Sequence, residues 1–140
     1  MKKYIITLTV LLLLSLVTAC SPKEEYISRE EALNKGYVVI DGTKSENHDR
    51  FGIFLKNVDA KREDSIHIVI YDLTRSQYVT TINYDGALLH ASRYFMDKDS
   101  NQSQVIDQMV YTHINKTESQ NYFLFDENNI HDHLWIYQGN

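Results

Sequence analysis

The sequence predicts an α+β fold in which two N-terminal helices pack on a five- or six-strand antiparallel sheet. Two observations predict it. Residues 28–36 and 47–62 carry helix-start signals and apolar residues at helical spacing. From Ser65 onward, the apolar residues fall instead in short β-rich runs separated by polar breaks. Helices followed by a series of strands are typical of the α+β class.

Residues 1–19 have the three parts of a secretory signal peptide. Two lysines follow the first methionine, Ile5 to Val17 is mostly apolar, and the last two residues are small. The apolar part is shorter than the roughly 20 residues that a permanent membrane-spanning helix needs, which favours its removal. Leu16-Val17-Thr18-Ala19-Cys20 resembles the lipobox of bacterial prolipoproteins, in which the cysteine thiol receives a diacylglyceryl group.

Cys20 is therefore predicted to carry the lipid that anchors the mature protein to the outer face of the cell membrane. It is the only cysteine in the chain, so an internal disulfide and a cysteine metal site are both excluded. Two acyl chains hold a protein firmly on a bilayer. An ordinary signal peptide with a chance cysteine and an uncleaved anchor helix are the alternatives.

Residues 20–26 are predicted to be the lipid anchor and a short linker, and residues 27–140 a single α+β domain. An extended residue covers at most about 3.6 Å, so the domain should lie within roughly 20 Å of the bilayer. The whole chain has a net charge of −5, and removal of the two signal lysines makes the mature protein more negative. This acidic balance argues against nucleic acid as a partner.

The two helices are predicted from their ends and their spacing. Ser28-Arg29-Glu30-Glu31 has the form of a capping box, and Gly36 can end the first helix in the left-handed conformation. Asn47 is the expected cap of the second helix. One face of that helix carries an apolar stripe: Phe51, Phe54, Leu55 and Val58. We interpret the stripe as core packing against the sheet; the alternative is a ligand groove.

The strands are predicted from six β-rich runs, of which the first three are expected to form an antiparallel meander. The first run carries mostly apolar residues on both of its faces, so it is expected to be a central strand that is covered on both sides. The run from Val105 also suits a helix, but its β-branched and aromatic residues favour a strand. A brief extended segment, Tyr37 to Ile40, precedes the second helix. The six runs are Ile66 to Leu73, Tyr78 to Tyr84, Ala87 to Met96, Val105 to Ile114, Tyr122 to Phe125 and Leu134 to Tyr137.

Several of these segments together resemble an uncharacterised family of lipoproteins from Bacillus and its relatives, known as a domain of unknown function. The resemblance covers most of the mature chain, and it implies fold and location but no activity. The chain departs from the family pattern at Thr74 to Tyr78, where a stretch with Gly-Asp-Pro is more usual. The similar segments are Glu31-Ala32-Leu33, Gly36 to Val39, Asn47 with the Phe51 to Val58 helix, and Ile82 to Gly86.

His131-Asp132-His133 is the most conspicuous polar cluster. On a strand the two histidines would point to one side, as two ligands of a metal ion do. A site needs a third ligand, and no spacing brings His67, His90 or His113 to this segment. We therefore interpret the cluster as a polar loop that leads into the last strand.

No catalytic motif or cofactor site is predicted. The only thiol is assigned to the lipid, no serine lies in a Gly-x-Ser-x-Gly elbow, and the five glycines are scattered rather than gathered in a phosphate-binding loop. Asp97, Asp99 and Asp107 are interpreted as solvated loop or strand-edge charges rather than as a catalytic pair.

Two function classes remain from the sequence: a non-enzymatic module that binds an envelope protein, a peptide or a small envelope component, and an enzyme with a site that no motif reveals. A metal-binding lipoprotein is a third option. Because the predicted helices can cover only one sheet face, we expect a contact surface on the other face or on the connecting loops. Its expected members are amphipathic: His67, Tyr71, Tyr78 and Tyr84.

Overall fold

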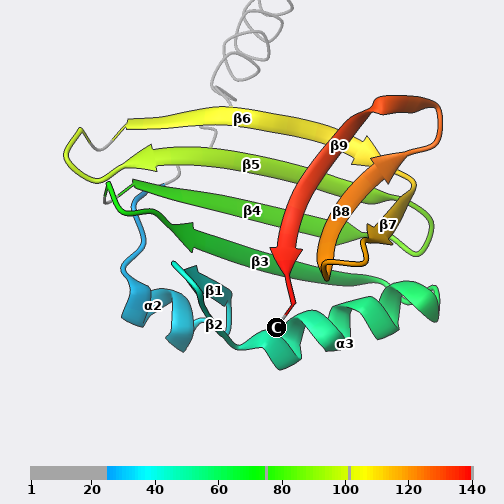
Figure 1. Cartoon of the computed structure of the whole chain (residues 1–140), viewed down its shortest axis with the longest axis horizontal. Helices are drawn as coiled ribbons and strands as arrows, with labels where there is room; N and C mark the ends of the chain where they lie inside the picture. Colours follow the sequence, from blue (N-terminus) through cyan, green and yellow to red (C-terminus); the bar gives the residue numbers. More distant parts are fainter. Residues whose placement is uncertain (1–24, 75, 101, 140) are drawn as a thin grey trace, which may run out of the picture.

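The computed structural model describes residues 25–74, 76–100 and 102–139. The predicted signal peptide and Cys20 lie outside these residues. Within them the chain forms two helices and nine strands (Figure 1). In chain order they are α2 (Arg29–Asn34), β1 (Val38–Asp41), β2 (Lys44–Glu46), α3 (His48–Asp59), β3 (Asp64–Tyr71), β4 (Ser76–Tyr84), β5 (Leu89–Asp97), β6 (Gln102–Tyr111), β7 (His113–Lys116), β8 (Asn121–Asp126) and β9 (Asn129–Gln138).

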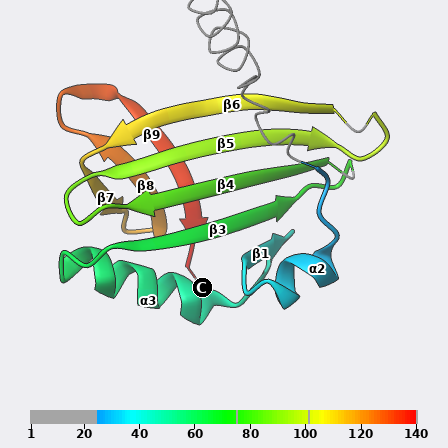
Figure 2. The same ribbon diagram turned by 180° about the vertical axis from the view of Figure 1, so that it is seen from behind.

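The α+β class is confirmed, and the main sheet has six strands in the order β2-β1-β3-β4-β5-β6 (Figures 1 and 2). The predicted antiparallel meander is present in β3 to β5 and continues into β6. The prediction of a wholly antiparallel sheet is wrong, because β1 pairs with β3 in parallel. The chain passes through β2 and α3 between these two strands, and such a crossover lets it return in the same direction.

The last three strands do not extend the main sheet but form a second antiparallel sheet, β7-β8-β9. The predicted strand between Val105 and Ile114 is confirmed, but Thr112 divides it between the two sheets. Both the backbone N–H and the hydroxyl of Thr112 donate to the carbonyl oxygen of Phe125, at 2.9 and 3.1 Å. These bonds hold the chain where it leaves β6 and enters the second sheet. The polar break predicted between Phe125 and Leu134 is shorter than expected, because β9 begins at Asn129. The interpretation of His131-Asp132-His133 as a loop is therefore wrong, since these residues belong to the strand.

The predicted start and stop of α2 are confirmed. The hydroxyl oxygen of Ser28 accepts a hydrogen bond from the Glu31 N–H at 3.2 Å, and Gly36 has a φ of +74°. Asn47 precedes α3 as predicted, but its side chain does not cap that helix. The Asn47 backbone is left-handed, with φ 54°, and its amide donates to the Tyr37 carbonyl at 2.9 Å. It therefore fastens α3 to the segment after α2.

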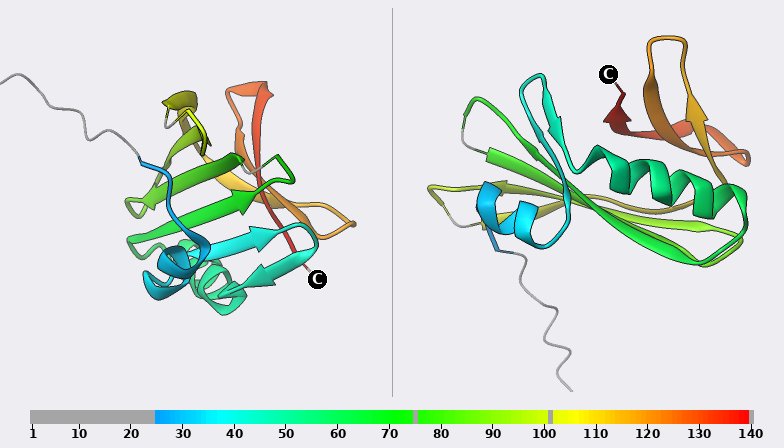
Figure 3. Two further views of the ribbon diagram at one scale, coloured as in Figure 1. Left: turned by 90° about the vertical axis from the view of Figure 1, so that its left-hand side faces the viewer. Right: turned by 90° about the horizontal axis from the view of Figure 1, so that it is seen from below.

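The larger core lies on the face of the main sheet that α3 and the second sheet cover, here called the front face (Figure 3). Phe51 and Phe54 of α3 are 2% and 0% exposed, which confirms the core interpretation for the first half of the stripe. The second sheet contributes Leu124, Ile136 and Tyr137 to the same cluster.

A smaller core lies on the opposite face, here called the back face. Ile27 and Ala32, from the segment around α2, pack there against Val69, Val79 and Met96. Because β3 is buried on both faces and lies between β1 and β4, its predicted central position is confirmed. In Figure 2 no described helix or strand lies in front of β4, β5 and β6, so α2 covers only part of the back face.

Candidate functional site

A cavity of about 540 Å³ lies between the C-terminal half of α3 and the second sheet. Leu55 and Val58, the second half of the apolar stripe, line it and are only partly buried. Ile114 of β7 and Tyr122 of β8 form the opposite wall. The stripe thus has two roles: its phenylalanines fill the core, while its aliphatic residues line a cavity.

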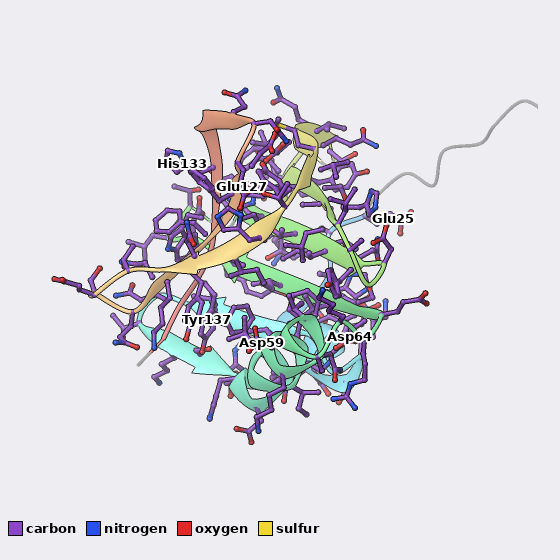
Figure 4. All side chains as sticks on the ribbon, turned by 90° about the vertical axis from the view of Figure 1, so that its right-hand side faces the viewer. Glu25, Asp59, Asp64, Glu127, His133 and Tyr137 are labelled. Atoms are coloured by element: carbon purple, nitrogen blue, oxygen red, sulfur yellow. The ribbon has the colours of Figure 1, made fainter. Side chains whose placement is uncertain are left out.

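Polar residues surround the mouth of this cavity. Lys61 follows α3, Lys116 ends β7, and both are exposed. Neither lysine forms an ion pair with a residue that the structure describes. The Lys116 ammonium lies 5.4 Å from the centroid of the Tyr122 ring. Asp59, at the end of α3 in Figure 4, is the one carboxylate among the lining residues.

His113 and Thr112 supply hydrogen-bonding groups at the same cavity. The His113 Nδ1 atom lies 2.9 Å from the Thr112 hydroxyl and 3.6 Å from a carboxylate oxygen of Glu127. The volume is within the roughly 300–1,000 Å³ of small-molecule sites, which are mostly apolar with a few placed polar groups. The arrangement suits a ligand with an apolar body and an anionic end.

No known protein family, curated protein or solved structure matches this chain. The resemblance to the Bacillus lipoproteins stays a prediction.

The sequence analysis named a ligand groove along this stripe only as the alternative to core packing, and it did not indicate the other walls of the cavity, because they come from segments far apart in the chain. Leu55 and Lys116 are brought together only by the packing of the second sheet against α3. The one available signal was the length of the stripe, which continues past the phenylalanines that fill the core.

The predicted anchor residue, Cys20, lies outside the described residues, but the chain that follows it is held on the back face. The Tyr71 hydroxyl donates to the Ile27 carbonyl at 2.8 Å. When the Gln77 side-chain amide is oriented so that both its nitrogen and its oxygen have a partner, its nitrogen donates to the Ile27 carbonyl at 3.1 Å and its oxygen accepts from the Ile27 N–H at 2.9 Å. Gln77 is fully buried. No helix among residues 25–139 is long and apolar enough to span a membrane.

The four residues expected on one open face do not share it. Tyr84 is only 7% exposed and packs in the front core, where it lines the cavity beside α3 rather than an open sheet face. Tyr78 lies on the front side against Phe95, with ring centroids 5.2 Å apart. Only His67 and Tyr71 lie on the back face. The prediction is wrong for the two tyrosines of β4, because that strand places its even-numbered residues beneath the front-face layer.

His67 lines a back-face hollow of about 360 Å³ with Tyr37 and Thr81. Its Nδ1 atom lies 2.9 Å from the Thr81 hydroxyl, and its ring stacks on Tyr37 at a centroid distance of 4.5 Å. Burial lowers the pKa of His67 from 6.5, and the positive charges of Arg50 and Lys35 lower it further. The neutral imidazole is thus favoured in the folded protein.

The histidine cluster of the sequence is not assembled into a metal site by the described residues. The side chains of His131 and Asp132 lie outside them, and His133 is exposed on β9, with its ring 5.7 Å from that of Phe123 (Figure 4). His90 instead pairs with Asp85 at 2.9 Å. The described part of the chain contains no group of three potential metal ligands.

The carboxylates considered for catalysis form local hydrogen bonds within their own segments. Asp97 accepts a hydrogen bond from the Asp99 N–H at 2.8 Å and so stabilises the turn after β5. Asp107, on β6, accepts one from the Tyr111 hydroxyl at 2.7 Å. Both arrangements are structural.

A second notable surface is β6, the edge strand of the main sheet. Val105, Ile106, Met109 and Val110 are 52%, 50%, 36% and 44% exposed. The pairing of β6 with β5 shifts register between Arg93 and Tyr94, so one extra β6 residue, Ile106, forms a bulge. The sequence predicted the strand but gave no sign that it is an edge.

Proposed function

We propose that this protein is a lipoprotein anchored through a diacylglyceryl group on Cys20 to the outer face of the cell membrane, and that its domain is a non-enzymatic binding module. Its site is the cavity between α3 and the second sheet. The ligand is a small amphipathic anion, with an aliphatic or aromatic body and a carboxylate, sulfonate or phosphate end.

The observation that carries this proposal is the combination of an apolar lining with two exposed lysines that form no ion pair with any described residue. Leu55, Val58 and Ile114 are partly exposed to the cavity, so a ligand that covers them removes apolar surface from water. Lys61 and Lys116 stand where the anionic end of such a ligand would lie. Among the lining residues the two lysines outnumber the single carboxylate of Asp59, although the protein as a whole is acidic.

The test uses 1-anilinonaphthalene-8-sulfonate, a fluorescent anion with an apolar body, and the chain from residue 21 onward. Both cores lie beyond residue 25, and cooperative unfolding of this fragment is checked first. We expect saturable binding at one site and competition by decanoate. Val58→Phe should fill the cavity and reduce binding. Lys61→Gln and Lys116→Gln should each weaken binding about two- to fivefold, the range of an exposed ion pair.

Matched controls come from the exposed side of the same helix. Ile53 is 51% exposed and does not line the cavity, so Ile53→Phe should leave binding unchanged. Lys56→Gln is the corresponding control for charge. Equal loss in the cavity variants and the controls, or no saturable binding by folded protein, would overturn the proposed site.

A further inference from the structure

The edge strand β6 has a bulge at Ile106 but is long and carries none of the lysines or prolines that keep many sheet edges from pairing. Edge strands are usually short or carry lysine or proline. The opposite edge of the main sheet, β2, is only three residues long, whereas β6 has ten and contains no lysine, arginine or proline. Its one charged residue, Asp107, is bound by the Tyr111 hydroxyl. No strand among the described residues pairs with the outer side of β6, which ends the main sheet.

The faces on which the β6 side chains lie decide which strand fits. Val110 is opposite His90 on β5 and so lies on the back face, with Gln108 two residues before it. Asp107 and Met109 are opposite Arg93 and Ala91 and lie on the front face. Residues that pair directly across two antiparallel strands must lie on the same face of the joined sheet.

We propose that β6 pairs in antiparallel fashion with β6 of a second copy of this chain, about a two-fold axis at Gln108. In this register Ile106 of each copy is opposite Val110 of the other, and the two Gln108 amides meet at the centre. Asp107 is opposite Met109, so the two like charges do not face each other. The strand is thus complementary to itself, as a two-fold interface requires.

The placement of the membrane anchor is compatible with this symmetry. A two-fold axis between antiparallel strands of one sheet is perpendicular to the sheet, so the back faces of both copies point the same way. Ile27, the first buried residue of the described chain, packs on the back face. Both linkers then leave from one side and can enter one bilayer. This step rests on the proposed anchor at Cys20, and anchoring in one membrane raises the effective concentration of the partners.

The pairing is tested by Gln108→Cys in the full-length chain, expressed in membranes and then oxidised. Residues opposite each other in an antiparallel pair have Cα atoms about 4.5–5.5 Å apart, within the range that a disulfide spans. We expect a disulfide-linked dimer. The matched control is Gln104→Cys, exposed on the same strand but away from the axis, which should remain monomeric. Equal crosslinking of both variants would mean random collision and would overturn the proposal.

A second measurement does not depend on an introduced cysteine. Light scattering of the detergent-solubilised chain should give the mass of a dimer, and Ile106→Lys should raise its dissociation constant about tenfold or more, because the change occurs twice per interface. A monomer at all concentrations, or a dimer unaffected by Ile106→Lys, contradicts pairing through β6. Disulfide crosslinking of the wild-type chain would show that the Cys20 thiol is free, which would overturn the proposed lipid anchor. In that case the double variant Cys20→Ala with Gln108→Cys would still test the pairing through β6.

Discussion

Arg93 on β5 donates a hydrogen bond from its guanidinium group to the backbone oxygen of Trp135 on β9, and so joins the two sheets. Its Nε atom also donates to the Thr80 hydroxyl at 2.8 Å. Burial lowers the pKa of Arg93, while the nearby Asp107 carboxylate opposes this effect. One side chain thus links the neighbouring strands β4 and β5 of the main sheet to β9 of the second sheet, which is distant from them in the sequence.

Replacement of Arg93 should therefore loosen the second sheet. Arg93→Met keeps much of the aliphatic stem but removes both donated bonds, and we expect a loss of about 1–3 kcal/mol in the free energy of unfolding. Urea unfolding measures it. Arg62→Met, at an exposed position after α3, is the control and should change stability by less than about 0.5 kcal/mol. Similar losses in the two variants would contradict the bridging role.

Two glycines should respond to alanine with opposite signs. Gly36 has a φ of +74°, so Gly36→Ala should destabilise the domain by about 1 kcal/mol although no atom blocks the new methyl group. Gly52 lies within α3 with open space around its Cβ position, so Gly52→Ala should stabilise the domain by up to about 1 kcal/mol. Thermal unfolding of both variants beside the wild type measures the two changes in stability. A loss of stability in Gly52→Ala would be inconsistent with this account.

Acidification should destabilise the protein partly through His67. Its pKa is lowered in the folded state, so below the ordinary value of 6.5 the unfolded chain binds a proton that the folded protein still excludes. The folded protein therefore has its full stability, as far as His67 is concerned, above pH 6.5, and it loses part of that stability as the pH falls from 6.5 toward the lowered pKa. His67→Gln should therefore lose less stability than the wild type between about pH 7.5 and about pH 5. His48→Gln, at an exposed position, is the control; an unchanged pH dependence in His67→Gln would refute the assignment.

Lipidation of Cys20 has a direct test. Replacement of Cys20 by alanine should abolish labelling of the protein by a fatty-acid probe in growing cells, because no other cysteine can receive the lipid. The wild-type chain, expressed at the same level, is the positive control. Labelling of Cys20→Ala to the same extent would exclude the lipoprotein assignment.

The elements that follow from local spacing were predictable. The periodicity of Phe51 and Phe54 predicted a helix because neighbours on a helical face are fixed by sequence distance alone. The β-branched residues before Thr112 predicted a strand for a similarly local reason. The parallel pairing of β1 with β3 and the separation of β7 from the main sheet depend on contacts between distant segments, such as the bonds of Thr112 to Phe125, and periodicity contains no information on them.

The candidate site was less predictable than the fold. Tyr84 has the character of a recognition residue, and its strand places it in the front core, where it lines the candidate cavity rather than the open face on which it was expected. Lys61 and Lys116 look like ordinary exposed charges in the sequence, and only their common position at one cavity gives them a role. The exposure of Ile106 depends on the order of strands, which ends at β6.

The attachment of Ile27 gives the domain a defined mechanical path. Tension on the linker is transmitted through the Ile27 backbone to Tyr71 at the end of β3 and to Gln77 near the start of β4, two strands in the interior of the main sheet. On the proposed anchoring at Cys20, the load thus reaches two strands that are each paired on both sides, rather than the short helix α2.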